Sequence, residues 1–487
     1  NLEAKHSNHR NVYMSTLDLD DINVIQTSNN FSAAVRFQYD YLNDDINEHG
    51  VIDYNLTNKL PFELRELIND SREKKKNAKK ILILINPPYG ETGTGIGKGN
   101  NNKKGIENTE INKLMNYGYA SKELFVQFLF RIKKELPNAT LAIFSTPKYV
   151  ISQNFSIFRE NWTAQYLDGF VFPSTLFDGI KGSFPISFLI WDMAKNMPIT
   201  GVKASVLDKK CNFTGEKYFI NESTNNLLNK WIVPPKTNDE LALPLSNAIS
   251  ISTNPRLKKS CTNMLGYLYA SNNDLQHATM ETLIASSIYT GGNGGGLYIT
   301  SDNIWQCAVV FSVRRLVKKT WLNNKDQFLQ PNCELPTIFQ QDCLIWMLFN
   351  GSNLTAGTAP DAFSWNNKKW QLKNNFIPFT EQQVGSKRRF SSTVMSDLIN
   401  DLDLSDEAKN VLEEGRKIWS AFFESNLNWK IREKYLLDDH SDAGWYQIRN
   451  ALKESESAID FTPFETAYGN LTEKLFPQVF EFGFLKA

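Results

Sequence analysis

The first 200 residues predict an α/β fold, and the rest of the chain predicts a mixed β/α region followed by a helical one. Short, nearly continuous apolar runs have the length and composition of buried strands, and they lie at residues 12–17, 35–39, 81–85, 141–145 and 186–191. Helical patterns separate several of these runs. Alternating strands and helices imply right-handed crossovers and a doubly wound sheet.

The clearest helical pattern follows Ser121, where apolar residues recur at helical spacing as far as Leu136. Ser121 has the side chain of a helix N-cap, and Pro137 lies just beyond the expected end. Doubly wound sheets bind ligands at the carboxyl ends of their strands. Asn86 is expected at such an end, because it follows the run at 81–85.

The composition changes near residue 201 and again near residue 391. Residues 205–220 and 286–313 predict hairpins, the second with a glycine-rich turn at 291–296. Residues 406–423 and 443–453 predict helices. We therefore predict three domains, over residues 1–200, 201–390 and 391–487.

Charge alone does not argue for a nucleic-acid partner, because 53 basic residues balance 53 acidic ones. Local basic runs are candidates for phosphate contacts, although solvated surface is the alternative for each: 72–80, 98–104, 314–319 and 387–389. The five cysteines are scattered and form no C-x-x-C pair, which favours a reducing cytoplasm over a disulfide framework. We predict no metal site and no membrane span.

Residues 81–90 read ILILINPPYG, an apolar strand that ends in an amide, two prolines and an aromatic ring. Prolines stiffen the turn and have no N–H, so the carbonyl beside Asn86 stays available as an acceptor. Two converging acceptors suit an amino group with two N–H donors, and Tyr89 offers a flat face for a planar ring. Acceptors placed there also stabilise the charge that develops when such a nitrogen attacks an electrophile.

This motif, formed by Asn86, Pro87, Pro88 and Tyr89, resembles the catalytic turn of amino-group methyltransferases that use S-adenosyl-L-methionine. Acidic residues precede it in order, at Asp18 and Asp40, each after a predicted strand. The arrangement resembles the N6-adenine-specific DNA methyltransferases of restriction-modification systems. The protein-glutamine and RNA methyltransferases, which share the motif, remain an alternative.

The resemblance implies a Rossmann-like methyltransferase sheet over residues 1–200, with S-adenosyl-L-methionine as the cofactor. Asp18 would hold its ribose, and Asp40, with Tyr41 and Leu42 beside it, would hold its adenine. Tyr89 and Phe184 would stack on the target base. Family members carry a glycine-rich cofactor loop after a first strand, but only the stretch NLEAKHSNHRN precedes Val12. We therefore expect the first strand and that loop to be missing from this chain.

The implied activity is methyl transfer to the N6 amino group of an adenine flipped out of double-stranded DNA. Residues 201–390 would recognise the target sequence, and a restriction or specificity subunit is an expected partner in restriction or phage defence. The alternative is a methylase-like DNA-binding module that is catalytically inactive because its cofactor pocket is incomplete.

Overall fold

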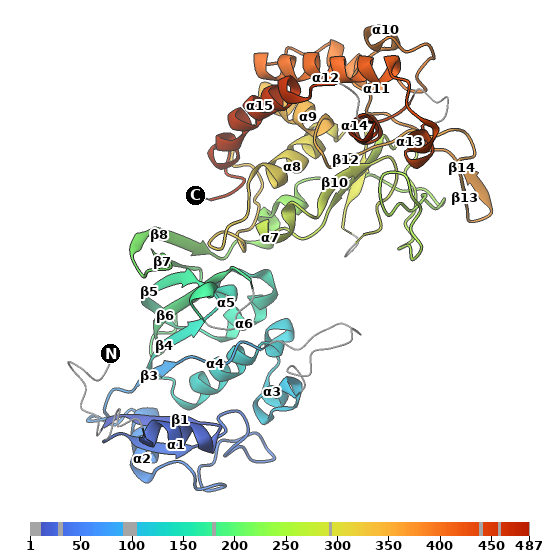
Figure 1. Ribbon diagram of the computed structural model, residues 1–487. Helices are drawn as coiled ribbons and strands as arrows, with labels where there is room; N and C mark the ends of the chain where they lie inside the picture. The colour runs from blue at the N-terminus through green and yellow to red at the C-terminus, as the bar shows by residue number, and fades with distance from the viewer. Residues whose placement is uncertain are drawn as a thin grey trace. The chain divides into compact units, whose positions relative to one another are not determined.

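The computed structural model describes residues 11–27, 33–90, 105–177, 182–291, 295–437, 442–455 and 459–486. The chain divides into two compact units, residues 1–222 and 223–487, which are treated separately below (Figure 1). The boundary expected after residue 200 falls within the first unit, because the strands that follow it join the first unit's sheet. The boundary expected after residue 390 falls within the second unit, where strands and later helices share one apolar core.

The first unit begins with a small parallel sheet of β1 (Tyr13–Thr16) and β2 (Val35–Gln38). The pairing continues one residue further, because the Tyr39 N–H donates to the Thr16 carbonyl at 2.9 Å. Helix α1 (Leu19–Thr27) follows β1, and α2 (Phe62–Arg72) follows β2. The ends of these two strands therefore lie side by side.

A larger sheet, called the large sheet below, has the described strand order β3, β4, β6, β5, β7, β8. Their bounds are β3 (Leu82–Ile85), β4 (Thr140–Ser145), β5 (Gln165–Pro173), β6 (Pro185–Asp192), β7 (Gly201–Leu207) and β8 (Phe213–Ile220). The strands expected from the apolar runs are confirmed, as is the hairpin over 205–220. The expectation of a parallel sheet is wrong in part: β3–β4 and β5–β7 are parallel, but β4–β6, β5–β6 and β7–β8 are antiparallel.

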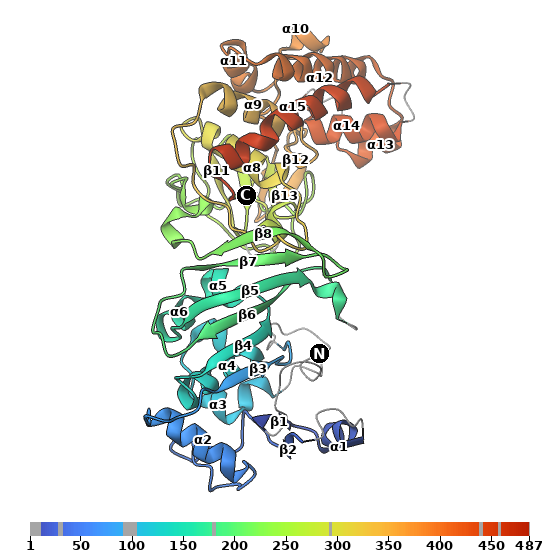
Figure 2. The ribbon, with the colours of Figure 1, turned by 90° about the vertical axis from the view of Figure 1, so that its left-hand side faces the viewer.

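The helices of the large sheet lie on one of its faces. These are α4 (Leu124–Glu135), α5 (Lys148–Ile151) and α6 (Ser156–Asn161), with α3 (Glu110–Leu114) preceding α4. Figure 1 shows α4, α5 and α6 to the right of the strands, and Figure 2 shows them behind the strands, with no described helix over the face turned toward the viewer. The described residues thus cover one face, whereas a doubly wound sheet carries helices on both.

The two faces of the large sheet differ in burial accordingly. Leu141 and Ile143 of β4 and Leu189 of β6 are fully buried beneath the helices. On the open face Leu82 and Leu84 of β3 are 65% and 50% exposed. Within the described part of the chain, β3 pairs only with β4, so its second edge has no strand partner.

The expected helix after Ser121 is confirmed as α4, but it begins later than predicted. The helix starts after Glu123, and Ser121 instead lies in a short 3-10 turn, where its hydroxyl accepts from the Tyr117 N–H at 3.2 Å. The buried stripe of α4 includes Phe125, Leu129 and Ile132, which is the spacing that predicted it.

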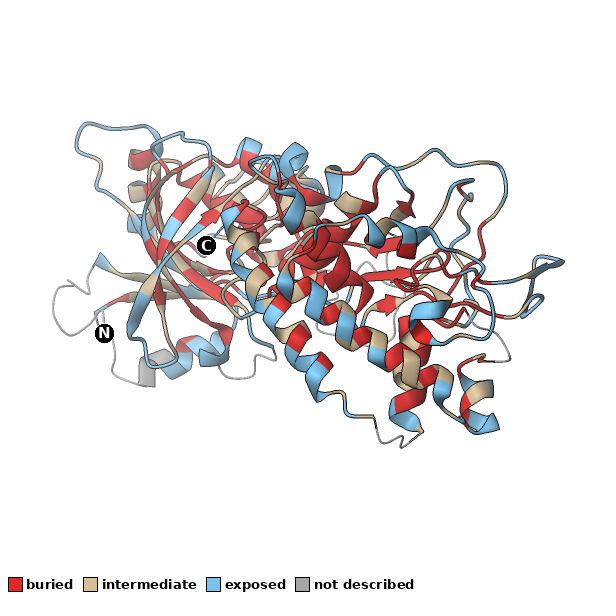
Figure 3. Ribbon diagram, turned by 90° about the horizontal axis from the view of Figure 1, so that it is seen from above, coloured by how far each residue is buried: buried red, intermediate tan, exposed pale blue. Residues whose placement is uncertain are grey.

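The second unit combines a sheet of described order β11, β9, β10, β12 with a layer of helices. The strands are β9 (Gly266–Ala270), β10 (Thr282–Ala285), β11 (Leu297–Ile299), β12 (Asn353–Leu354), β13 (Phe363–Trp365) and β14 (Lys368–Trp370). The helices are α7 (Leu275–Ala278), α8 (Ile304–Leu316), α9 (Thr337–Leu348), α10 (Glu381–Val384), α11 (Val394–Asn400), α12 (Asp406–Glu424), α13 (Trp429–Lys434), α14 (Trp445–Glu454) and α15 (Thr462–Glu481). Figure 3 shows buried residues gathered in the interior and exposed ones on outward helix faces.

The predictions for this unit have mixed outcomes. The helices expected over 406–423 and 443–453 are confirmed as α12 and α14. The hairpin expected over 286–313 is wrong, because a short strand, β11, is followed by α8. Helix α8 is buried nearly all round, so its sequence carries no polar face that would mark it as a helix. No helix in the described residues is long and apolar enough to cross a lipid bilayer.

Candidate active site

The Asn-Pro-Pro-Tyr turn leaves the carboxyl end of β3 and presents polar groups to solvent. Asn86 is exposed and Pro87 is buried, while Tyr89 is 38% exposed. The Tyr89 hydroxyl donates to Asn86 Oδ1 at 3.0 Å, which holds the amide and the ring together. The Gly90 carbonyl accepts from the Leu124 N–H at 2.9 Å, and this bond ties the turn to the first residue of α4.

The ring of Tyr89 borders a group of phenylalanines at the same end of the large sheet. Its centroid lies 6.4 Å from that of Phe177, which in turn lies 5.7 Å from Phe172 and 6.5 Å from Phe144. Burial raises the pKa of Tyr89 to about 12. The phenol is therefore protonated at neutral pH, and its hydroxyl can serve as a donor.

Phe184, the residue expected to stack on a base, lies at the entrance to β6 and is half-buried. Its backbone pairs with Ser174: the Ser174 N–H donates to the Phe184 carbonyl at 2.9 Å, and the Phe184 N–H donates to Ser174 Oγ at 3.2 Å. The ring that lies next to Tyr89 belongs instead to Phe177. Both phenylalanines belong to the stretch 176–192, whose sequence did not distinguish them.

The two acidic residues lie at the carboxyl ends of the paired strands β1 and β2. Asp18 is exposed, and within the described residues its carboxylate makes no hydrogen bond or ion pair. Asp40 is half-buried and organises its own loop. Its carboxylate accepts from the Leu42 N–H at 3.1 Å and from Asn43 Nδ2 at 2.8 Å.

Tyr41 and Leu42 use their side chains in packing. The Tyr41 hydroxyl donates to Glu135 Oε2 at 2.5 Å, and Leu42 is 7% exposed. Guanidinium nitrogen Nη1 of Arg131 donates to the Tyr41 carbonyl at 2.6 Å. These side chains therefore face the interior. The backbone of Leu42 is paired as well, because its N–H donates to Asp40 and its carbonyl accepts from the Ile111 N–H at 3.1 Å.

The segment around Asp40 is held by a buried polar cluster, called the α4 clamp. It consists of two residues of α4, Arg131 and Glu135, and of three tyrosines from the segment after β2: Tyr39, Tyr41 and Tyr54. Arg131 and Glu135 are 0% and 2% exposed at the side chain, with 3.6 Å between Nε and Oε2. Tyr39 accepts from Arg131 Nη2 at 2.7 Å, and Tyr54 donates to Glu135 Oε1 at 2.7 Å. Burial raises the pKa values of Tyr39 and Tyr54, so both hydroxyls stay protonated.

Sequence reasoning missed the α4 clamp, although a signal was present. Arg131 and Glu135 are a charged pair at helical spacing in a helix whose buried residues are otherwise apolar except for Gln127. Such a pair needs buried polar partners, and the loop after β2 supplies them.

Helix α4 thus fixes both candidate loops. Leu124 holds the Asn-Pro-Pro-Tyr turn, and Arg131 holds the loop of Asp40. At 1.5 Å per residue these anchor points lie about 10 Å apart along the helix. A further ion pair, between Lys148 Nζ and Glu123 Oε1 at 2.9 Å, ties the segment after β4 to the start of α4.

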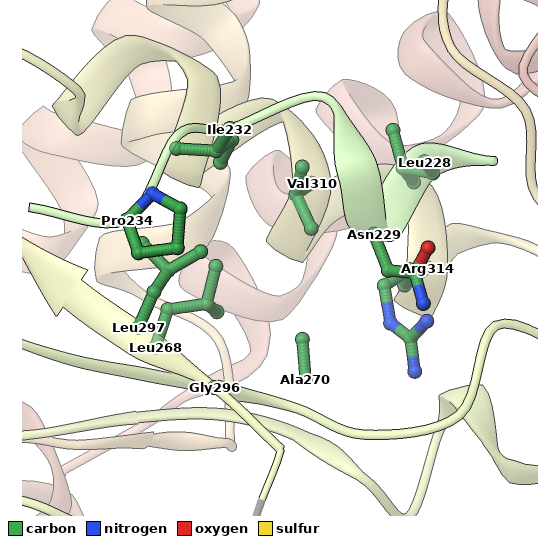
Figure 4. A pocket seen from close by; sticks show the side chains of 10 residues that line it. All are labelled: Leu228, Asn229, Ile232, Pro234, Leu268, Ala270, Gly296, Leu297, Val310 and Arg314. Carbon is green, nitrogen blue, oxygen red and sulfur yellow. The ribbon is translucent and has the colours of Figure 1, made fainter. Parts of the chain in front are cut away.

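The second unit contains a cavity of about 120 Å³ beside α8 and β9 (Figure 4). Aliphatic side chains form most of its wall, and Arg314 and Asn229 lie at one side. Arg314 is 1% exposed and donates to the carbonyls of Ser271 and Asn272 and to Thr282 Oγ1, at 2.7 Å each. Its guanidinium therefore links α8 to the ends of β9 and β10.

The basic runs have different outcomes. The run at 314–319 was a candidate for phosphate contacts, and this prediction is wrong for Arg314, which is buried. Lys318 and Lys319, at the end of the run, are exposed. The whole run at 98–104 lies outside the described residues. Among the residues that the structure describes, no cluster of His, Cys, Asp or Glu side chains could hold a metal ion.

Comparisons with known proteins match solved structures only. No protein-family model matches the sequence. No curated protein matches it. Solved structures similar to parts of it include a nuclease-deletion mutant of the Type ISP restriction-modification enzyme LlaGI in complex with a DNA substrate mimic, at 15% identity and a TM-score of 0.23. Another is the ATP-dependent Type ISP restriction-modification enzyme LlaBIII bound to DNA, at 12% identity and a TM-score of 0.25.

These alignments cover 43% and 54% of this chain but only 18% and 19% of the respective enzymes. A likeness of this size establishes neither a shared fold nor a shared activity.

Proposed function

We propose that this chain carries the active site of an S-adenosyl-L-methionine-dependent methyltransferase that modifies the N6 amino group of adenine in DNA, in a restriction-modification or phage-defence system. One observation carries the proposal. The amide of Asn86 and the ring of Tyr89 are exposed together at the carboxyl end of β3, in a turn that α4 holds in place.

The residues of the turn have complementary roles in this reaction. Asn86 Oδ1 and the Pro87 carbonyl accept the two hydrogens of the N6 amino group and favour a more tetrahedral nitrogen. As positive charge develops on N6, both oxygens stabilise it. Tyr89 stacks on the adenine ring, and its hydroxyl aligns the Asn86 amide before the base enters. When bound, S-adenosyl-L-methionine would supply the electrophilic methyl group: its sulfur–methyl bond would break as the N6–methyl bond forms, and one N6 proton would pass to solvent at the exposed turn.

The acidic residues fit the cofactor in part. Asp18 offers an exposed carboxylate that can accept two ribose hydroxyls. Asp40 already accepts one donor on each oxygen, yet a carboxylate has about four acceptor sites and can take a further N–H. The side chains of Tyr41 and Leu42 are packed in the interior, so this segment would contact the cofactor through its backbone. The Leu42 N–H would have to exchange Asp40 for the cofactor.

The substrate is proposed to be double-stranded DNA with the target adenine flipped out, because a stacked base hides N6 from this turn. Phe177, whose ring lies next to Tyr89, supplies apolar surface for the base, and Phe184 is proposed to add to it. Recognition of the target sequence is assigned to the second unit. We further propose that the protein acts in the cytoplasm and that a restriction or specificity subunit is its partner.

A second candidate is a DNA-binding module without catalysis. Two observations on β3 favour it. Among the described residues no strand pairs with the second edge of β3, and the side chains of Leu82 and Leu84 are exposed. A cofactor site open along this edge would bind S-adenosyl-L-methionine weakly.

The two candidates are separated by cofactor calorimetry and methyl transfer on the full chain. Asn86→Ala is compared with Asn55→Ala, which changes an exposed asparagine whose side chain makes no hydrogen bond within the described residues. We expect Asn86→Ala to lower the methylation rate at least about 100-fold, the loss of one oxyanion-hole-type group, and to leave cofactor affinity unchanged. Full activity of Asn86→Ala would refute the proposed mechanism, and DNA binding without cofactor binding would establish the module.

A further inference from the structure

The hairpin of β13 and β14 projects from the second unit (Figure 1). Its strands pair Phe363 with Trp370 and Trp365 with Lys368. The turn is Asn366–Asn367, with φ of 53° and 56°. Positive φ at both turn residues is the geometry of the tight hairpins that follow the natural twist of two strands, and asparagine tolerates it well.

The base of this hairpin is firmly anchored. Phe363 is 9% exposed and belongs to an apolar core cluster, against which Trp365 and Trp370 also pack. The two indole rings lie 5.9 Å apart, and Trp370 Nε1 donates to the Trp365 carbonyl at 3.0 Å. The tip is therefore held in a defined position.

The tip itself is polar and has few partners. Asn366, Asn367 and Lys368 are exposed, and their side chains make no hydrogen bond or ion pair within the described residues. Lys369 Nζ lies 3.4 Å from Asp361 Oδ2, but both side chains are more than 60% exposed. An ion pair that exposed contributes little to stability, so Lys369 can exchange Asp361 for another anion.

We infer that this hairpin enters the major groove of DNA, where Asn366 and Asn367 contact base edges and Lys368 and Lys369 contact phosphates. The inference rests on the proposed function, which makes DNA the substrate. Asparagine amides match the donor and acceptor of an adenine edge, and lysine matches phosphate or guanine. A two-stranded ribbon fits the roughly 12 Å wide groove of B-form DNA, whereas the major groove of A-form RNA is too narrow.

The test measures binding of the full chain to a pool of 30-base-pair duplexes with randomised sequence, by fluorescence anisotropy between 50 and 200 mM salt. The phosphate contacts are tested with Lys368→Gln/Lys369→Gln. The matched control is Lys409→Gln/Lys417→Gln, which removes the same charge from the exposed face of α12. We expect the slope of log affinity against log salt to fall in magnitude by about 1.8 for the hairpin variant only.

The base contacts are tested with Asn366→Gly/Asn367→Gly, since glycine keeps the positive φ of the turn and removes both amides. Sequences selected from the pool should lose their preference at adjacent positions, by about 5- to 150-fold, and keep it elsewhere. Circular dichroism checks that each variant is folded.

Hairpin variants that bind and select DNA as the unaltered chain does would overturn the inference and leave the proposed function standing. Equal competition by double-stranded RNA would overturn it as well. Absence of DNA binding by the unaltered chain would overturn both the inference and the proposed function.

Discussion

The α4 clamp gives a sharp prediction for the substitution Arg131→Met. The guanidinium donates to the carbonyls of Tyr41 and Asp44, at 2.6 and 2.9 Å, and lies beside the buried carboxylate of Glu135. Methionine fills similar volume without charge. The change therefore leaves Glu135 as a buried anion with only neutral donors, and it leaves both carbonyls without this donor.

The expected cost follows from this arrangement. Removing one partner of a buried ion pair costs about 3–5 kcal/mol, because the other charge stays in a poorly solvated site. Removing both charges, in Arg131→Met/Glu135→Gln, should cost less than the sum of the single changes, since no uncompensated charge remains. A control on the same helix, Lys134→Met, removes an exposed charge and one hydrogen bond, from Lys134 Nζ to the Gly50 carbonyl at 2.9 Å, and should cost about 1 kcal/mol.

The assay is urea unfolding at 25 °C followed by circular dichroism, with the transition of the first unit fitted separately because two units need not unfold together. Calorimetry on the same variants measures cofactor affinity, which should fall because Arg131 positions the loop of Asp40. The reasoning is refuted if Arg131→Met costs less than about 1 kcal/mol, or if the double change equals the sum of the single ones.

Two further predictions concern stability. Burial raises the pKa of Tyr54 above its ordinary value of 10.0, so the unfolded chain loses this proton first and the free energy of unfolding falls as pH rises above 10. Tyr54→Phe should make that decline shallower in urea titrations from pH 8 to 11.5, and an unchanged slope would contradict the assignment. Gly415→Ala should lower the urea midpoint of the second unit, because the added Cβ would lie 2.2 Å from an atom of the buried Phe349 ring. Overpacking of about 1–3 kcal/mol outweighs the helix-propensity gain of about 1 kcal/mol, and a raised midpoint would contradict this.

Strands that form unbroken apolar runs were predictable from the sequence, as β3, β4 and β6 show. Strand β5 was missed because Asp168 and Gly169 interrupt its run, and the register shifts at that point. Helix α8 was missed because a segment buried on all sides has no polar face. Local pattern thus predicts a strand from an unbroken apolar run, but it does not identify an interrupted strand or a helix that is buried on nearly all sides.

Part of the candidate site was likewise predictable from the sequence, and part of it was not. The turn of Asn86 and Tyr89 was predictable because four consecutive residues carry its chemistry. Its neighbours were not, because Phe177 and Leu124 reach it from elements far along the chain. The role of Tyr41 also depends on distant residues, since Glu135 draws its hydroxyl into the interior.

The most direct test of the central claim is to locate the transferred methyl group. The full chain is incubated with double-stranded DNA and S-adenosyl-L-methionine carrying an isotopically labelled methyl group, and the DNA is then digested to nucleosides for mass spectrometry. The account predicts label on the N6 nitrogen of deoxyadenosine, accumulating at least about 100-fold more slowly when Asn86 is replaced by alanine. Label on cytosine or on protein, or label on adenine that accumulates at an undiminished rate in Asn86→Ala, would contradict it.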